Sequence, residues 1–256
     1  MTQPREIRHY GWIPDVPDQR DHLYAAPAPI LRALPTSADL RKQCPPVYEQ
    51  GMLGSCTANA IAAAVEFDRL KQRLADFVPS RLFIYYNERV IEGTVPIDSG
   101  AMLRDGIKTV ASDGVCPEPE WPYDIAKFTR KPPKKCYDDA KLDRAVSYQS
   151  IIQDLNQMKG CLGSGYPFIF GFTVYESFEA DAVKKTGHAP MPGWGERPVG
   201  GHAVMAVGFD DARQWFLVRN SWGDEWGLKG YFTLPYAYFI QPGLARDFWT
   251  IRLVGK

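Results

Sequence analysis

Apolar residues in the first half of the chain recur at the three- to four-residue spacing of helices. The clearest such stripe runs from Cys56 to about residue 75, and Pro79 follows it as a stop signal. Further helices are expected over residues 81–91, 100–111 and 152–162. Residues 114–145 are rich in proline and show little periodicity, so they predict a long surface connection.

The second half changes to short apolar and β-branched runs that are separated by turn residues. These runs cover residues 168–174, 203–209, 215–218, 230–234 and 248–253. Helices followed by a mostly antiparallel sheet indicate an α+β fold with two lobes. Residues 1–33 hold no sustained period, so they cannot form a core of their own and are expected to pack on the rest of the chain.

Composition narrows the class of protein. The 256 residues are 45% hydrophobic, enough for one large domain or two fused lobes. Thirty basic and thirty acidic residues cancel, and no apolar run approaches the roughly 20 residues of a membrane span. We therefore expect no nucleic-acid and no membrane partner. Separately, we expect a monomer. The amino terminus leads into no secretory core, which leaves the compartment open between the cytoplasm and export by an absent or non-standard signal.

Five cysteines mean that at least one thiol stays unpaired, and Cys56 is the natural candidate. The other four, Cys44, Cys116, Cys136 and Cys161, could form two disulfides by any of three connectivities or stay reduced. No Cys-x-x-Cys or His-x-x-x-His spacing occurs, so the sequence predicts no zinc site, and no cofactor is expected.

The candidate chemistry centres on Cys56. A free thiol has a pKa of about 8.5, but helix amides and an imidazolium can lower it to about 3.5 to 7.5. His202 could supply that imidazolium and protonate a leaving amine, and Asn220 could hold the far ring nitrogen. Gln50, with the backbone N–H of Cys56, could stabilise an oxyanion.

Each of these residues also has an ordinary structural explanation. Cys56 could be a small core residue, His202 a hydrogen-bonded core histidine, Asn220 part of a turn and Gln50 a surface side chain. Their joint occurrence in this order and spacing favours a thiol hydrolase. Two other functions stay open: a binding module without turnover, and acyl transfer to an amine by the same residues.

At these residues the chain resembles the papain family of cysteine peptidases, in particular bacterial members with a short amino-terminal extension. The motifs are Pro46-Val47-Tyr48-Glu49-Gln50-Gly51, Gly54-Ser55-Cys56, His202-Ala203-Val204 and Asn220-Ser221-Trp222-Gly223. The resemblance covers residues 34–256. It implies a papain-like fold with a helical lobe over about 45–150 and a β lobe over about 151–256. It also implies an endopeptidase that forms an acyl-enzyme on peptide or protein substrates.

The resemblance extends to substrate binding. It assigns this role to Ser99, Gly100, Ala101, Met102, Gly171, Gly201, Ala203, Trp222 and Asp247. Among these, Trp222 would cover the hydrogen bond between Asn220 and His202. Asp247 would lie at the floor of the pocket for the second residue before the cut, where it would admit Arg as well as Leu or Phe.

Three departures from the family pattern stand out. Leu53 replaces a disulfide cysteine, Thr57 replaces the usual aromatic after the nucleophile, and residues 1–33 replace a longer helical proregion. We hypothesise that residues 1–33, anchored by Trp12 or nearby aromatics, lie on or near the cleft as an intramolecular, zymogen-like inhibitor. The alternative is that they pack on the back of a lobe.

Overall fold

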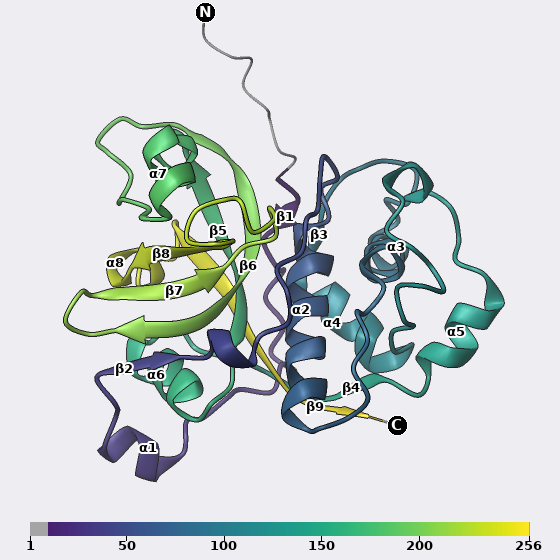
Figure 1. Ribbon diagram of the computed structural model, residues 1–256, viewed down its shortest axis with the longest axis horizontal. Coiled ribbons are helices and arrows are strands. Elements are labelled where there is room, and N and C mark those ends of the chain that lie inside the picture. The colour runs from purple at the N-terminus through teal and green to yellow at the C-terminus, as the bar shows by residue number, and fades with distance from the viewer. Residues whose placement is uncertain (1–9, 256) are drawn as a thin grey trace, which may run out of the picture.

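A computed structural model describes residues 10–255, in which helices pack beside an antiparallel sheet (Figure 1). The α-helices are α1 (Ala28–Arg32), α2 (Cys56–Lys71), α3 (Arg81–Glu92), α4 (Leu103–Ser112), α5 (Lys134–Ala140), α6 (Leu155–Gly163), α7 (Asp181–Thr186) and α8 (Tyr236–Phe239). The strands are β1 (Trp12–Ile13), β2 (Ser37–Asp39), β3 (Ala101–Met102), β4 (Arg144–Ser150), β5 (Phe168–Tyr175), β6 (Pro198–Asp210), β7 (Trp215–Arg219), β8 (Tyr231–Pro235) and β9 (Ala245–Gly255). Short 3₁₀ helices are η1 (Arg41–Gln43), η2 (Ile125–Lys127) and η3 (Glu176–Glu179).

The sheet is antiparallel throughout and runs in the order β4-β9-β5-β6-β7-β8, with β2 paired to the end of β6. A separate parallel pair joins β1 to β3. The expected α+β class with an antiparallel second half is therefore confirmed. No helix within residues 10–255 is long and apolar enough to cross a bilayer.

Helix α2 lies between the antiparallel sheet and the helices α3 and α4. Its residues are buried almost all round, and the alanines in it allow close approach on several sides. It packs on β6 and β9 on one side and on α3 and α4 on the other (Figure 1). The side chain of Ser55 at its N-cap accepts no backbone N–H of the helix, so the first amides of α2 stay available to Cys56.

Several elements fall where the sequence patterns lie. Helix α3 begins after Ser80, whose Oγ accepts from the Phe83 N–H at 3.2 Å, and it ends at Gly93 in the left-handed region. Strand β5 coincides with the apolar run at residues 168–174. Strand β6 begins five residues before the predicted start at residue 203.

Two expectations need correction. The proline-rich stretch at residues 114–145 is not only a surface connection, because it includes α5 and leads into β4, which pairs with β9. Strand β4 was missed because it lies at the sheet edge and is mostly half-buried, which leaves no clear alternation. Residues 10–33 are also not wholly irregular, since they contain β1 and α1, two elements too short to show a period.

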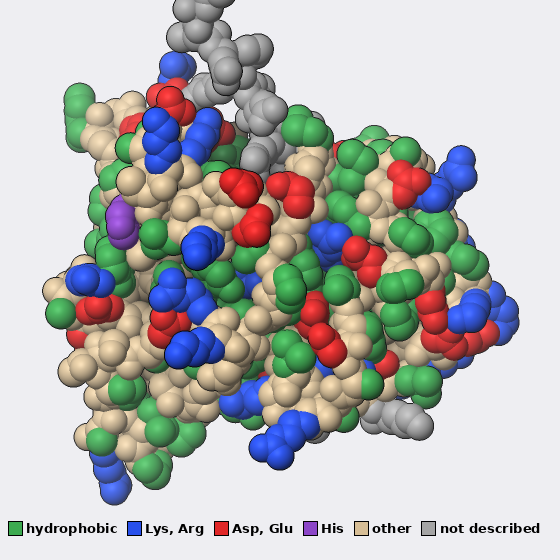
Figure 2. Space-filling view, in the orientation of Figure 1, with side chains coloured by type: hydrophobic (Ala, Val, Ile, Leu, Met, Phe, Trp, Pro, Cys, Tyr) green, Lys and Arg blue, Asp and Glu red, His purple; other side chains and the backbone are tan. Residues whose placement is uncertain are grey.

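The β side of the molecule has an aromatic core. Its largest fully buried rings are Trp249, Phe168, Phe170, Phe172, Phe216, Phe232 and Phe239. Phe172 also meets the His202 ring edge-on at 5.8 Å, so this packing supports one wall of the site. On the face in Figure 2, acidic and basic side chains are interspersed, in keeping with the balanced charge.

Candidate active site

Cys56 is the first residue of α2 and is fully buried. The backbone N–H groups of Gly11, Thr57 and Ala203 reach its sulfur and favour the thiolate. Burial outweighs them and raises the pKa of the Cys56 thiol to about 12. The thiol is therefore protonated in this state, and part of what buries it is the amino-terminal segment that contains Gly11.

His202 lies on β6 and is fully buried. Its Nε2 donates to the side-chain oxygen of Asn220 at 2.8 Å, and that oxygen also accepts the Ser221 N–H at 2.9 Å. Because the Ser221 N–H can only donate, this atom is the amide oxygen, and Nε2 of His202 must carry a proton to bond to it. The Trp222 ring stacks on His202 at 4.7 Å and covers this pair.

Gln50 is fully buried and joins the Cys56 side to the Asn220 side of the site. Its Nε2 donates to the Leu53 carbonyl at 3.0 Å, and its Oε1 accepts from Ser221 Oγ at 2.6 Å. The Gln50 N–H also donates to the Ser221 carbonyl at 2.9 Å. The structure therefore holds the four predicted catalytic residues in one buried region.

The amino-terminal segment Tyr10-Gly11-Trp12 lies directly over this region. The Gly11 carbonyl accepts from the Ala101 N–H at 2.7 Å, next to the parallel pair of β1 and β3. A side chain on Gly11 would overlap the Gly54 carbonyl. Close contact at this point therefore requires glycine. The Tyr10 ring lies 5.9 Å from the His202 ring.

Trp12 fills a pocket and is only 7% exposed. A side chain on Gly171 or Gly201 would collide with its ring or backbone, so both glycines make room for Trp12. Its Nε1 donates to Asp247 Oδ2 at 3.2 Å. Three of the residues predicted to bind substrate thus contact Trp12 itself.

Asp247 adopts a left-handed backbone, with φ of 59°, and faces a second acid. Its Oδ2 accepts from the Asp15 N–H at 2.8 Å, and Asp15 in turn accepts from Trp249 Nε1 at 2.9 Å. Burial, and after it the nearby Asp15, raise the pKa of Asp247 to about 7. The pKa of Asp15 is also raised by burial.

The other residues predicted to bind substrate differ in whether they lie against the site. Ala101 and Met102 form β3, and Ala203 lies beside Cys56. Gly100 takes a positive φ of 74° against Gly11. Ser99, however, donates to the Gly100 carbonyl and to Thr94 at 2.9 Å, so its side chain belongs to its own loop.

Sequence reasoning missed several residues that surround the site. They are Tyr10, Gly11, Asp15, Tyr123, Glu179 and Trp249. Tyr123 donates to the Gln50 carbonyl at 2.9 Å, and Tyr10 donates to Glu179 at 2.7 Å. The aromatic residues in the amino-terminal segment were a signal for its docking, but no local pattern indicated which residues they contact.

A separate hollow of about 530 Å³ lies over β2, β6 and β7, lined among others by Asp39, Arg41, His188 and Trp215. None of its lining residues belongs to the candidate site. The region over Cys56 is filled by Tyr10, Gly11 and Trp12.

Comparisons with known proteins show similarity to cysteine proteases. The sequence profile described as papain family cysteine protease matches residues 34–246. A peptidase C1-like protein of Acanthamoeba polyphaga mimivirus is 45% identical over 272 residues, covering 96% of this chain and 88% of the relative. The crystal structure of xylellain, a cysteine protease from Xylella fastidiosa, matches with a TM-score of 0.88 and 44% identity over 98% of both chains. Digestive procathepsin L 3 of Tenebrio molitor matches with a TM-score of 0.72 and 18% identity, over 96% of this chain and 76% of its own, which supports the fold alone.

Proposed function

Because the chain belongs to the papain family of cysteine proteases, we propose that it is an endopeptidase whose nucleophile is Cys56. His202 carries the proton, and Asn220 orients His202. The observation that carries this proposal is the hydrogen bond from His202 Nε2 to Asn220. It leaves Nδ1 as the ring nitrogen that exchanges a proton with the thiol at the start of α2.

In the first step, the Cys56 thiolate attacks the peptide carbonyl carbon and a carbon–sulfur bond forms. The oxyanion takes hydrogen bonds from the Cys56 N–H and from the Gln50 side-chain amide. The His202 imidazolium protonates the leaving amine as the carbon–nitrogen bond breaks. His202 then accepts a proton from water, which hydrolyses the thioester and restores the thiol.

The segment Tyr10-Gly11-Trp12 inhibits this site in the same chain. Its Gly11 N–H faces the Cys56 sulfur, while the Gly11 carbonyl is held by Ala101. The sulfur therefore meets a hydrogen-bond donor instead of an electrophilic carbon, and the segment blocks the site without being cut. Removing it would let solvent reach Cys56 and lower the pKa of the thiol.

Trp12 indicates the substrate preference of the pocket that it fills. Gly171 and Gly201 leave space for an indole, and Asp247 accepts its N–H. A pocket with this shape and acceptor suits a large aromatic or basic side chain. We place that side chain at the second residue before the cut, where it displaces Trp12.

The test compares Trp12→Ala with the unaltered protein and with Trp12→Ala/Cys56→Ala. Fluorogenic peptides carry Trp, Arg or Ser at the second position before the cut, and an epoxysuccinyl inhibitor reports on the thiol. Trp12→Ala removes burial worth about 1.5 to 3 kcal/mol that holds the segment over Cys56. It should therefore raise kcat/KM roughly 10- to 100-fold. The Trp and Arg peptides should be preferred over Ser.

Leu23→Ala serves as the matched control, because this side chain lies in the same amino-terminal region but is 64% exposed. A folded Trp12→Ala protein without increased cleavage would refute inhibition by the segment. Absence of labelling in every variant would favour an inert binding module, and amide products formed with added amines would favour acyl transfer.

A further inference from the structure

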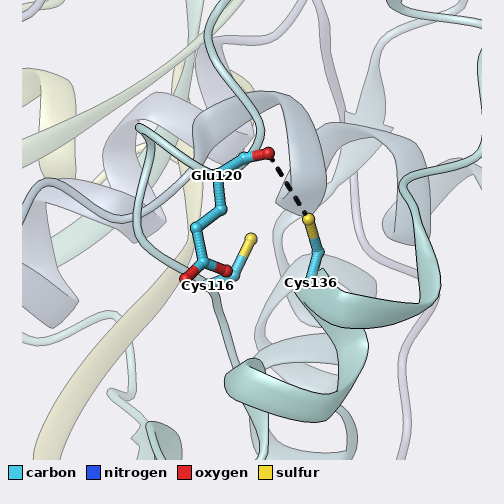
Figure 3. A group of neighbouring side chains, drawn as sticks. All are labelled: Cys116, Glu120 and Cys136. Carbon is cyan, nitrogen blue, oxygen red and sulfur yellow. Dashed lines mark hydrogen bonds between the residues drawn. The ribbon is translucent and has the colours of Figure 1, made fainter.

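Two of the remaining cysteines meet at a distance from the candidate site. Cys116 follows α4 in the loop before Trp121, and Cys136 lies on α5 (Figure 3). Their sulfurs and one oxygen of Glu120 all lie within 4.8 Å of one another. Both cysteines are buried, at 0% and 1% exposure. The proposed hydrolysis uses neither of them.

The surroundings of this cluster favour neutral sulfur. The Cys136 thiol donates to the Glu120 backbone carbonyl at 3.7 Å, which a thiolate or a metal ligand would not do. Burial raises the pKa of both thiols, and their contact raises that of Cys116 further. Lys135 already binds Glu120 Oε1 at 2.9 Å. A structural zinc site would need four ligands, and this group offers three side chains, one of them already paired.

We propose that Cys116 and Cys136 form a disulfide that closes the loop between them. The two cysteines are twenty positions apart in the sequence and their sulfurs already lie within 4.8 Å of each other, so the bond needs only a small local adjustment. A disulfide also replaces two buried thiols by a group that has no S–H donor and so needs no hydrogen-bond acceptor. The bond forms while the chain folds, before α5 covers the pair.

The reaction needs an oxidant, and a small-molecule disulfide such as oxidised glutathione supplies it. One cysteine thiolate attacks a sulfur of that disulfide and releases one glutathione thiolate. The second cysteine thiolate then attacks the mixed disulfide and releases another. The two cysteines lose two protons and two electrons, and the glutathione disulfide is reduced to two thiols.

The bond would fix a loop that supports other elements. The Cys116 carbonyl accepts from the Ser80 N–H at 2.9 Å, and the Trp121 carbonyl accepts from Ser80 Oγ at 2.7 Å. Farther along the same loop, Tyr123 reaches the Gln50 carbonyl. The disulfide therefore connects α5 to the start of α3 and to the region around Gln50.

The other cysteines have separate surroundings and stay as thiols in this proposal. Cys44 donates to the Leu40 carbonyl at 3.4 Å. Cys161 lies against the Pro167 carbonyl and Thr250 Oγ1 at 3.8 and 3.5 Å. Only one of the two disulfides that the cysteine count allows is therefore expected, and Cys56 remains free.

The test refolds the full chain in a buffer of reduced and oxidised glutathione. Thiols are counted in denaturant, the disulfide is mapped by mass spectrometry after proteolysis, and metal is measured by elemental analysis. We expect three thiols, five after reduction, and one peptide pair that links Cys116 to Cys136. Reductant should lower Tm by roughly 5 to 10 °C, as for a loop of this length in a chain of this size.

In Cys116→Ser/Cys136→Ser, reductant should leave Tm unchanged, whereas Cys44→Ser should keep the full effect of reductant. This comparison does not depend on how far either variant is itself destabilised. The proposal is overturned by five thiols after refolding, by a different pairing, or by one bound zinc ion per chain with no disulfide.

Discussion

At the residue scale, the environment of Cys56 combines groups that favour a thiolate with burial that keeps the thiol protonated. The amides that surround the sulfur favour the thiolate, and burial opposes them more strongly. Part of this burial comes from Gly11, which is not covalently tied to the position it occupies. The state of the thiol therefore depends on whether a few residues stay docked.

Gln50 allows a prediction on catalysis at this scale. Gln50→Ala, made together with Trp12→Ala so that the site is open, should lower kcat about 100- to 1000-fold through loss of an oxyanion donor. Ser221→Ala is the control, because it removes only the 2.6 Å hydrogen bond to Gln50 Oε1. Steady-state kinetics should show a far smaller loss for Ser221→Ala. Equal losses would mean that Gln50 acts only by positioning its neighbours.

Asp247 gives a prediction on pH. Its pKa is raised in the docked state to about 7, from an ordinary value of 3.8. Because the pKa of Asp247 is higher when Trp12 is docked, the protonated carboxyl group stabilises docking. This contribution is complete below about pH 4 and is lost as pH rises through about 7. Docking of Trp12 should therefore weaken between about pH 4 and pH 7.

The measurement is the rate of epoxysuccinyl labelling of the unaltered protein, divided by that of Trp12→Ala at each pH. This ratio should rise with pH. Asp247→Asn keeps the side-chain acceptor without the charge, so it should flatten the rise. A ratio that falls with pH, or an unchanged profile in Asp247→Asn, would contradict this assignment.

At the element scale, β1 and its partner β3 are the two shortest strands of the described chain, and β1 belongs to the segment that covers the site. Strand β1 has only two residues, pairs in parallel with β3, and is anchored by the side chain of its own first residue, Trp12. A two-residue strand is not stable by itself. The position of β1 therefore depends on close packing. The packing is closest at Gly11.

Gly11→Ala tests that contact. The added methyl group would overlap the Gly54 carbonyl, so β1 must shift away from Cys56. We expect activity to rise as it does for Trp12→Ala, with little change in the rest of the fold. Gly243→Ala is the matched control, because a side chain there meets nothing within 4 Å. Peptide cleavage that stays at the unaltered level in Gly11→Ala would show that β1 tolerates the clash.

At the scale of the whole molecule, the amino-terminal segment bridges the two sides of the site. β1 pairs with β3 on the helical side, while Trp12 packs on Gly171 of β5 and bonds to Asp247 of β9 on the sheet side. The proposed inhibition within one chain rests on this arrangement, since the segment already lies over Cys56. Its effective concentration does not change with dilution.

Activity per molecule should therefore be constant from nanomolar to micromolar protein, with size-exclusion chromatography run in parallel. Adding catalytically inert Cys56→Ala protein should also leave the activity of Trp12→Ala unchanged. Specific activity that falls as protein concentration rises would indicate that segments are exchanged between molecules.

Much of the fold could be predicted from local patterns. The stripe after Cys56 and the strand runs of the second half depend on residues close in sequence, and they correspond to α2, β5, β6, β7, β8 and β9. Strand β4 could not be predicted, because an edge strand with half-buried residues has no strong alternation. The site motifs could be recognised because each is a short string around one reactive side chain.

The sequence by itself determined the class of fold, the papain-like resemblance and the candidate residues Cys56, His202, Asn220 and Gln50, because each follows from a local period or motif. The tertiary structure decided which residues meet across long separations. It brought Trp12 to Asp247 and Cys116 to Cys136, and it placed Gly11 over the thiol. No local pattern encodes these contacts, because they arise only when the helices and the sheet pack together.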